Sequence, residues 1–138
     1  PRAREPLPEL TRHRDGSVRQ SAVNGLHGEI HAGNPEALAA VIERTRDEES
    51  GVRHAACMAL RFAPMRSGSS DALAACLSDE DEKVRVTAAA HLALRDDPRG
   101  DDVLDALGYP DEDSPYYWLI YEVSRHQRLI SQAPHGRL

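Results

Sequence analysis

The amino-acid sequence predicts an all-α protein, an α-α superhelix in which three to four helical hairpins stack on one another. The first observation is a phrase that recurs three times, with Val at its start, Arg one residue later, Ala at +4 and Leu at +8. It begins at Val18, Val52 and Val84, which lie 34 and 32 residues apart. The second observation is that no segment alternates apolar and polar residues as a half-buried strand does.

The third observation is the scarcity of aromatic residues. They make up 4% of the chain, and five of the six lie beyond Gly108. The preceding residues are therefore packed mainly by Ala, Leu and Val. Small side chains of this kind suit close contact between helices and fill a sandwich or a barrel poorly.

Turn and capping residues divide the chain into a short or degenerate first helix and seven further helices. Ser17 is expected to cap the second helix, and Gly33 and Pro35 separate it from the third. Near the end of the chain, Ser114 is expected to cap the last helix, with Pro115 in its first turn. The predicted helices cover residues 6–12, 18–31, 36–46, 52–62, 71–77, 84–94, 101–107 and 116–131.

Positions 0, +4 and +8 of the phrase form one narrow stripe along a helix. At about 100° per residue they lie within roughly 80° of one another. We expect this stripe to be buried in every copy. The Ala at +4 marks the closest approach of the paired helices, where a larger side chain would overpack.

The phrase also predicts a ladder of charged pairs. Asp47 and Asp79 stand six residues before Arg53 and Arg85, in the turns between helices. An Asp in each turn and an Arg at the start of each following helix can bond along the stack and fix its register. The expected ladder residues are Arg19, Asp47, Arg53, Asp79 and Arg85. In the first copy, a histidine occupies the position of the Asp.

These phrases resemble the HEAT family of helical repeats, including the short HEAT-like type of phycobilin lyases (PBS-lyase type) found in bacterial proteins. The resemblance rests on residues 77–94, with weaker copies at 47–60 and 15–26, and spans about residues 6–108. It implies one HEAT-like domain over residues 1–138. The implied repeats cover residues 6–33, 35–66 and 69–97, with a degenerate C-terminal cap at 101–131.

In this family the second helix of each hairpin lines the inner face. The resemblance therefore places positions +2, +6 and +9 of each phrase on a surface open to a partner. These positions are polar in the first two copies and apolar in the third, where Val86, Ala90 and Ala93 occupy them. The candidate partner-binding residues from the first two copies are Gln20, Asn24, His27, His54, Met58 and Arg61.

The last predicted helix carries two stripes. Tyr116, Ile120, Val123 and Ile130 form one, and Trp118, Tyr121 and Arg125 form the other. One interpretation is that this helix caps the open end of the stack. The other is that Trp118 and Tyr121 form an aromatic binding site for a protein, because Trp, Tyr and Arg dominate such sites. Both hold if one stripe packs and the other is exposed.

We find no motif for catalysis, and we expect neither a metal nor a cofactor. His27 and His31 stand four residues apart, but no third ligand accompanies them and the HExxH order is absent. The acidic runs lack the spacing of a calcium-binding loop. Cys57 and Cys76 form no CxxC pair and suit a reducing compartment.

The composition favours a protein as the partner over a nucleic acid. The formal net charge is −6, and Lys and Arg do not recur along the expected inner face. We therefore expect a non-enzymatic scaffold or adaptor, cytoplasmic, and a monomer or a weak dimer. Two alternatives stay open: a nucleic-acid-binding HEAT-like module related to DNA-repair glycosylases, and an accessory subunit of an enzyme. The sequence contains no run of 18 apolar residues, so it predicts no membrane span.

Overall fold

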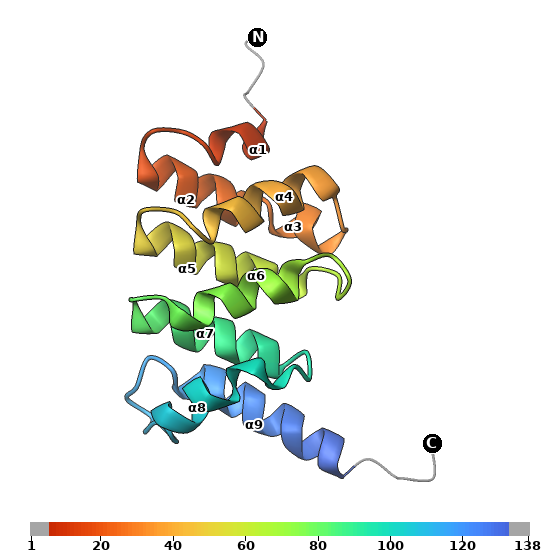
Figure 1. Ribbon diagram of the computed structural model, residues 1–138, viewed down its shortest axis with the longest axis vertical. Coiled ribbons are helices and arrows are strands. Elements are labelled where there is room, and N and C mark those ends of the chain that lie inside the picture. Colours follow the sequence, from red (N-terminus) through yellow and green to blue (C-terminus); the bar gives the residue numbers. More distant parts are fainter. Residues whose placement is uncertain (1–5, 133–138) are drawn as a thin grey trace.

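The computed structural model describes residues 6–132, and in this range the chain forms nine α-helices and no strand. The helices stack along one axis as hairpins, which confirms the predicted all-α superhelix (Figure 1). Parts of the predicted domain, residues 1–5 and 133–138, lie outside the described residues. The α-helices are α1 (Leu7–Leu10), α2 (Gly16–Gly25), α3 (His27–His31), α4 (Pro35–Arg44), α5 (Ser50–Ala59), α6 (Ser69–Ala75), α7 (Glu82–Ala93), α8 (Asp101–Leu107) and α9 (Tyr117–Ser131).

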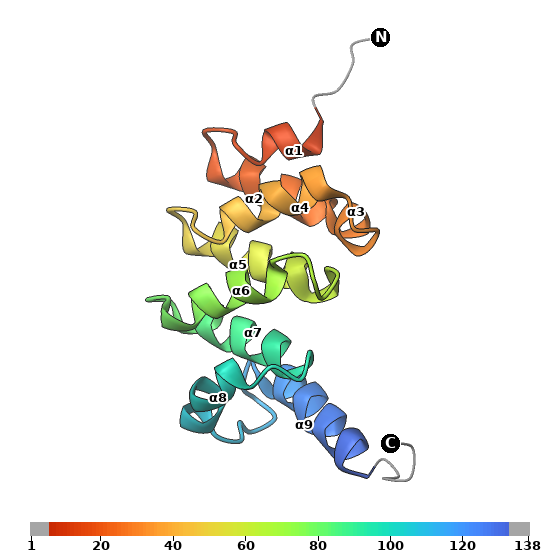
Figure 2. The same cartoon turned by 45° about the vertical axis from the view of Figure 1, so that its right-hand side comes forward.

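Three short 3-10 turns extend or precede these helices. They are η1 (Leu60–Phe62), η2 (Cys76–Ser78) and η3 (Pro98–Gly100). In one layer α2 contacts α5, which contacts α7, and in the other layer α1 contacts α4, which contacts α6. The pairs α1–α2, α4–α5 and α6–α7 therefore form successive hairpins of the stack, and α8 and α9 follow below α7 (Figure 2).

The core lies between the two layers, and the repeated phrase supplies it. Val52, Ala56 and Leu60 have no exposed surface, and the same holds for the corresponding residues of α7. In the first copy Ala22 and Leu26 are buried and Val18 is half-buried. The predicted stripe is therefore confirmed. The largest side chains of the rest of the core are Val23, Ile30, Leu38, Val41 and Leu73.

The predicted helix over residues 18–31 is divided in the structure. It breaks at Leu26, whose φ and ψ are −93° and 1°, and α3 follows with a new start. Gly25 precedes the break, and a Cβ built there would lie 3.0 Å from a methyl group of Leu7. The Leu7 side chain of α1 thus leaves little room for a Cβ at this position, and glycine weakens the helix where it breaks.

Two predicted caps differ from the structure. Asp15, not Ser17, caps α2, because its carboxylate accepts from the backbone N–H of Ser17 at 2.9 Å. Ser114 accepts from the backbone N–H of Tyr116 at 3.1 Å, and α9 begins one residue after that. In both places the polar side chain accepts from the backbone N–H two residues later, as in an Asx turn or a Ser turn, and this bond shifts the cap from the predicted position.

Candidate protein-binding face

The candidate inner-face residues lie on the layer of α2 and α5, with the degree of exposure decreasing along the stack. Gln20, Asn24 and His27 are exposed, although His27 opens α3 after the break. On α5, His54 is half-buried and the side chain of Met58 is 40% exposed. This face is therefore open over the first two hairpins.

Over the third hairpin the same face is covered. Val86, Ala90 and Ala93 of α7 are buried, and the last two form a small cluster with Val123 of α9. Leu119 of α9 and Leu104 of α8 pack against this cluster. The small apolar side chains of α7 thus form the surface on which α9 lies.

The two stripes of α9 have different environments. Ile120 and Val123 are buried, whereas Trp118 is 71% exposed and Tyr121 is 44% exposed. Ile130 shares a predicted stripe with Ile120 and Val123, but it is exposed, because it lies in the last turn of α9 and is not part of the cluster on α7. One stripe of this helix packs on the stack and the other faces solvent.

The exposed Trp118 and Tyr121 form a cluster with the half-buried Tyr117. The Trp118 ring is edge-on to Tyr117 at a centroid distance of 5.1 Å and to Tyr121 at 5.8 Å. Such T-shaped pairs are favourable because the ring edge is positive and the face negative. We call Tyr117, Trp118 and Tyr121 the aromatic cluster.

Polar contacts join α9 to the rest of the stack. Glu122 forms an ion pair with Arg61, which follows α5. Tyr116 donates from its hydroxyl to Glu82 of α7 at 3.2 Å, and His126 contacts Asp96 at 2.9 Å. The Arg61 guanidinium is therefore paired with the Glu122 carboxylate of the same chain, and this ion pair connects the open polar face to the first half of α9.

A cavity of about 320 Å³ lies where α5, α7 and the start of α9 meet. Its lining is mostly apolar or aromatic, with His54 and Lys83 as titratable groups. Burial is the main cause of a lowered pKa for His54, and nearby Lys83 lowers it further. The lining residues are His54, Met58, Lys83, Thr87, Pro115, Tyr116 and Leu119.

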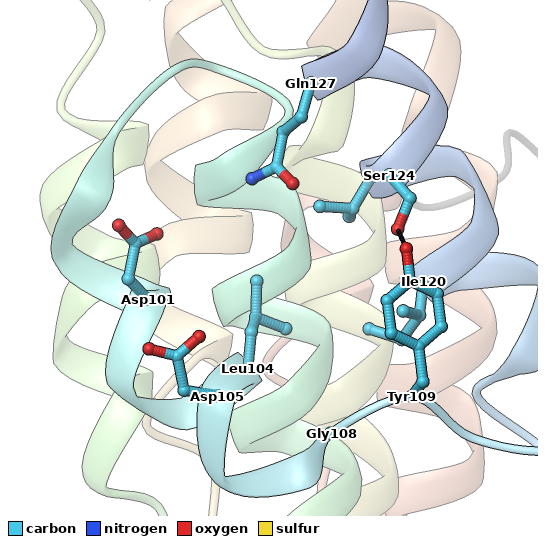
Figure 3. Close-up of a pocket in the computed structure, with 9 residues that line it drawn as sticks. Asp101, Leu104, Asp105, Gly108, Tyr109, Ile120, Ser124 and Gln127 are labelled. Atoms are coloured by element: carbon cyan, nitrogen blue, oxygen red, sulfur yellow. Dashed lines mark hydrogen bonds between the residues drawn. The ribbon is translucent and has the colours of Figure 1, made fainter.

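A second cavity, of about 390 Å³, lies between α8 and α9 (Figure 3). Asp101 and Asp105 line it from α8, and Ser124 and Gln127 line it from α9. The hydroxyl of Tyr109 donates to Ser124 at 2.7 Å across its rim. No hydrogen bond in this lining joins a nucleophile to a base; the Tyr109–Ser124 bond joins two hydroxyl groups.

The predicted ladder residues meet as two bidentate pairs. Arg19 donates to both oxygens of Asp47 at 2.8 and 3.0 Å, and Arg53 donates to both oxygens of Asp79 at 2.8 and 3.1 Å. Each arginine also donates to two carbonyl oxygens of the turn before its own helix. One side chain therefore fixes its own turn and the next turn of the stack.

Asp47 stays ionised despite its burial. Burial raises the pKa of its carboxyl, but hydrogen bonds from Arg19, from the backbone N–H of Glu49 and from Arg44 outweigh this effect, so the pKa is lowered. The buried charge is thus compensated by several donors.

The ladder does not continue at Arg85 or before Arg19. Arg85 donates to the carbonyls of Asp79 and Glu80 in its own turn, and no carboxylate of the described residues accepts from it. At the other end His13 replaces the Asp, and its Nδ1 accepts from the backbone N–H of Asp15 at 3.0 Å. The imidazole thus forms the same local turn without offering a carboxylate.

The sequence did not predict the buried contacts of two polar residues, Arg95 and His91. Arg95 donates to the hydroxyls of Ser69 and Ser70 and to the carbonyls of Leu60 and Ala63. His91 is 1% exposed, and its Nδ1 lies 3.1 Å from the Cys57 carbonyl. Neither residue belongs to a shared position of the repeated phrase, so the sequence carried no signal for their contacts.

No group of three or more metal-ligating side chains occurs within residues 6–132. His27 and His31 are both exposed, on a helix of five residues. Cys57 and Cys76 are buried free thiols, and their mutual hydrogen bond together with burial raises the pKa of Cys57. In the described part of the chain, no helix has the length and apolar character needed to cross a membrane.

A family model for HEAT repeats matches residues 3–75, which is more than half of the chain. No match to this chain is found among curated proteins.

Proposed function

Because the chain belongs to the HEAT repeat family, whose members are commonly scaffolds for protein interactions, we propose that it is a non-enzymatic protein-binding module. The partner would lie on the open face of α2 and α5 and extend to the aromatic cluster of α9. Candidate contacts are Gln20, Asn24, His27, His54, Met58, Arg61, Trp118 and Tyr121.

The exposure of Trp118 carries this proposal. An indole that is 71% exposed, with Tyr121 beside it, is costly to leave in water and adds little to the packing of α9. Aromatic side chains of this kind dominate the energetics of protein interfaces. The half-buried cavity beside His54 and Met58 provides an adjoining depression for a partner's apolar side chain.

The polar residues of α2 and α5 would set specificity in this arrangement. Gln20 and Asn24 offer hydrogen-bond donors and acceptors at modest desolvation cost, whereas the aromatic cluster supplies apolar burial. Arg61 would contribute through its ion pair with Glu122, which holds α9 beside the open face.

Affinity capture with residues 1–138, followed by mass spectrometry, tests the proposal. A true partner is retained by the unchanged protein and by Met65→Ala, which truncates an exposed apolar side chain that is not among the candidate contacts. It is lost with Trp118→Ala, while circular dichroism shows unchanged helix content. Unaltered capture by Trp118→Ala, or unfolding of this variant, contradicts the proposal.

A parallel titration with random duplex and single-stranded DNA tests the alternative. A nucleic-acid binder shows dissociation constants of about 10⁻⁴ to 10⁻⁶ M even for non-specific DNA at about 150 mM salt, with steep salt dependence. We expect no binding under these conditions. Sub-micromolar binding that Arg61→Glu abolishes would favour the nucleic-acid reading.

A further inference from the structure

The turns that join the paired helices lie along one edge of the stack, and their charge changes along it. The turns α1–α2, α4–α5, α6–α7 and α8–α9 follow one another on the left of Figure 1. The first two carry most of the arginines of this edge. In the third and fourth the charged residues are all acidic: residues 79–82, which run into the start of α7, read DEDE, and residues 111–113 read DED.

An open cavity of about 390 Å³ lies between the first two turns. Its lining contains five guanidinium groups and two carboxylates. We call Arg12, Arg14, Arg44 and Arg46 the basic edge. The full lining is Arg12, His13, Arg14, Arg19, Arg44, Arg46, Asp47 and Glu48.

Two of the three carboxylates beside the basic edge are already bonded, whereas Glu48 is exposed and lies only within 3.7 Å of Arg19. Asp47 accepts from Arg19 with both oxygens, from Arg44 at 2.9 Å and from the backbone N–H of Glu49 at 2.9 Å. Glu43 accepts from Arg44 at 2.6 Å. These bonds leave little acceptor capacity for the other guanidinium groups.

The remaining guanidinium groups are correspondingly under-used. Arg14 and Arg46 are exposed, and neither side chain forms an ion pair with a residue in the range 6–132. Arg12 lies 3.8 Å from Glu43 with both side chains half or more exposed, a weak contact. The Nε of Arg44 is buried without an acceptor among the described residues. The cavity thus presents several donors and few free acceptors.

The local charge pattern limits the kind of anion that fits. A nucleic-acid backbone needs an extended positive track. Here Glu48 and Glu49 follow at once, and the next turn carries the acidic run 79–82, which would repel a continuing chain of phosphates. A short anionic segment over Arg12, Arg14 and Arg46 avoids residues 79–82, and the three guanidinium groups there outnumber the exposed carboxylate of Glu48. Guanidinium forks match carboxylates in shape, as Arg19 and Asp47 do within the same cavity.

We propose that the basic edge binds a short Asp/Glu-rich segment of a protein partner, at a site separate from the aromatic cluster. The carboxylates of this segment would accept from Arg14, Arg46 and Arg12 and lie over the cavity between the first two turns. The acidic turns further along the edge would hold the segment to the first two turns and prevent it from extending over the rest of the stack.

Fluorescence anisotropy with a labelled Asp/Glu hexapeptide, at about 50 mM salt where exposed charges are only partly screened, tests this site. We expect the double variant Arg14→Glu with Arg46→Glu to weaken binding by about tenfold or more, since two attractive contacts become repulsive. Arg66→Glu with Arg128→Glu changes the net charge equally, at exposed positions outside the cavity, and should retain the affinity. A matching Asn/Gln hexapeptide should not bind.

Several results would overturn the proposal. One is the absence of binding, and another is equal loss in both double variants, which would indicate only the net charge. DNA binding tighter than peptide binding, and lost with Arg14→Glu and Arg46→Glu, would assign the edge to nucleic acid. A salt-sensitive dimer in sedimentation velocity, lost in the same variant, would assign it to a second copy of the chain. Trp118→Ala should leave peptide binding unchanged, which separates this site from the proposed function.

Discussion

Gly100 lies against the backbone of α7 so closely that no other residue fits there. A Cβ built on it would be 2.6 Å from the Cα of Ala89 and 3.0 Å from its carbonyl oxygen. Its φ of −92° is open to any residue, so the constraint is the close approach and not the backbone conformation. Gly28, inside α3, has nothing within 4 Å of its Cβ position.

This contrast gives a matched pair of substitutions. Gly100→Ala should lower the free energy of unfolding by about 1–3 kcal/mol, because backbone atoms must move apart. Gly28→Ala should raise it by about 0.5–1 kcal/mol, because alanine favours a helix over glycine. Urea denaturation measures both. Equal midpoints for the two variants would show that η3 can shift away from α7 at no cost.

His91 makes the stability of the chain depend on pH. Burial is the main cause that lowers the pKa of His91 to about 4, although its bond to the Cys57 carbonyl opposes the shift. The unfolded state, with a pKa near 6.5, then binds the proton more readily than the folded state. Stability is therefore complete above about pH 6.5 and falls as the pH drops toward 4.

His91→Gln should reduce this dependence and leave the contribution of His54, whose pKa is also lowered by burial. The unchanged protein should lose roughly 3 kcal/mol between pH 7 and 4, because the pKa of His91 is near 6.5 in the unfolded chain and about 4 in the folded one, and each pH unit between them corresponds to 1.36 kcal/mol. His91→Gln keeps a polar group near Cys57 but cannot titrate, so its stability should change much less over this interval. His27→Gln, at an exposed histidine, should retain the full loss. Parallel pH curves for all three proteins would rule out His91 as the cause.

At the scale of helices and turns, the arginine ladder distinguishes two otherwise equivalent residues. Arg53 bonds its own turn and the Asp79 carboxylate of the next turn, whereas Arg85 bonds only its own turn. Lysine cannot reproduce the forked pair. Arg53→Lys should therefore lower the free energy of unfolding by about 1–3 kcal/mol more than Arg85→Lys.

A double-mutant cycle checks the origin of this difference. Asp79→Asn combined with Arg53→Lys should cost less than the sum of the two single changes, because they remove the same bonds. Asp79→Asn and Arg85→Lys share the turn but no side-chain pair, so their costs should add more nearly. Full additivity in the first cycle would contradict a coupled pair.

The sequence predicted those elements whose contacts repeat. Val52, Ala56 and Leu60 recur with one spacing, and a regular helix converts that spacing directly into a buried stripe. The position of α9 could not be predicted in this way. The surface on which α9 packs depends on the small side chains of Ala90 and Ala93 of α7. No local pattern in residues 116–131 specifies that α9 packs against α7.

The candidate site likewise combines features set within one helix with contacts between residues distant in the sequence. The separation of Trp118 from Ile120 follows from helical periodicity within one segment, and the structure has them on different sides. The pairing of Arg61 with Glu122 joins residues 61 positions apart, and that of Arg95 with the Leu60 carbonyl joins residues 35 apart. Contacts between single, non-repeated residues require the folded chain.

At the scale of the whole molecule, burial is unevenly distributed along the stack. Nine of the twelve residues of α7 and six of the ten of α5 are buried, compared with two of the fifteen of α9 and none of α8. In stacked repeats each unit is stabilised mainly by its neighbours, so units with little buried surface can open separately.

Native-state hydrogen exchange should therefore show two levels of protection. Amides of α5 and α7 should exchange only through global unfolding, with the same free energy as denaturation gives. Amides of α8 and α9 should exchange at a lower free energy, and Val123→Ala should lower it further without affecting α5. Equal protection of all helices would mean that α8 and α9 open only together with the rest.

The ladder also bears on how such a chain can lengthen by tandem duplication. Residues 47–78 begin with the carboxylate that receives Arg19 and contain the arginine that reaches Asp79. A second copy of these residues, inserted in register, would receive Arg53 on its own Asp and send its own Arg to Asp79. Every pair of the ladder would remain complete, so the ladder itself would need no compensating mutation when a unit is gained in this interval. The arginine of a unit inserted before His13 would lie against the His13 imidazole, which has no carboxylate to accept from it.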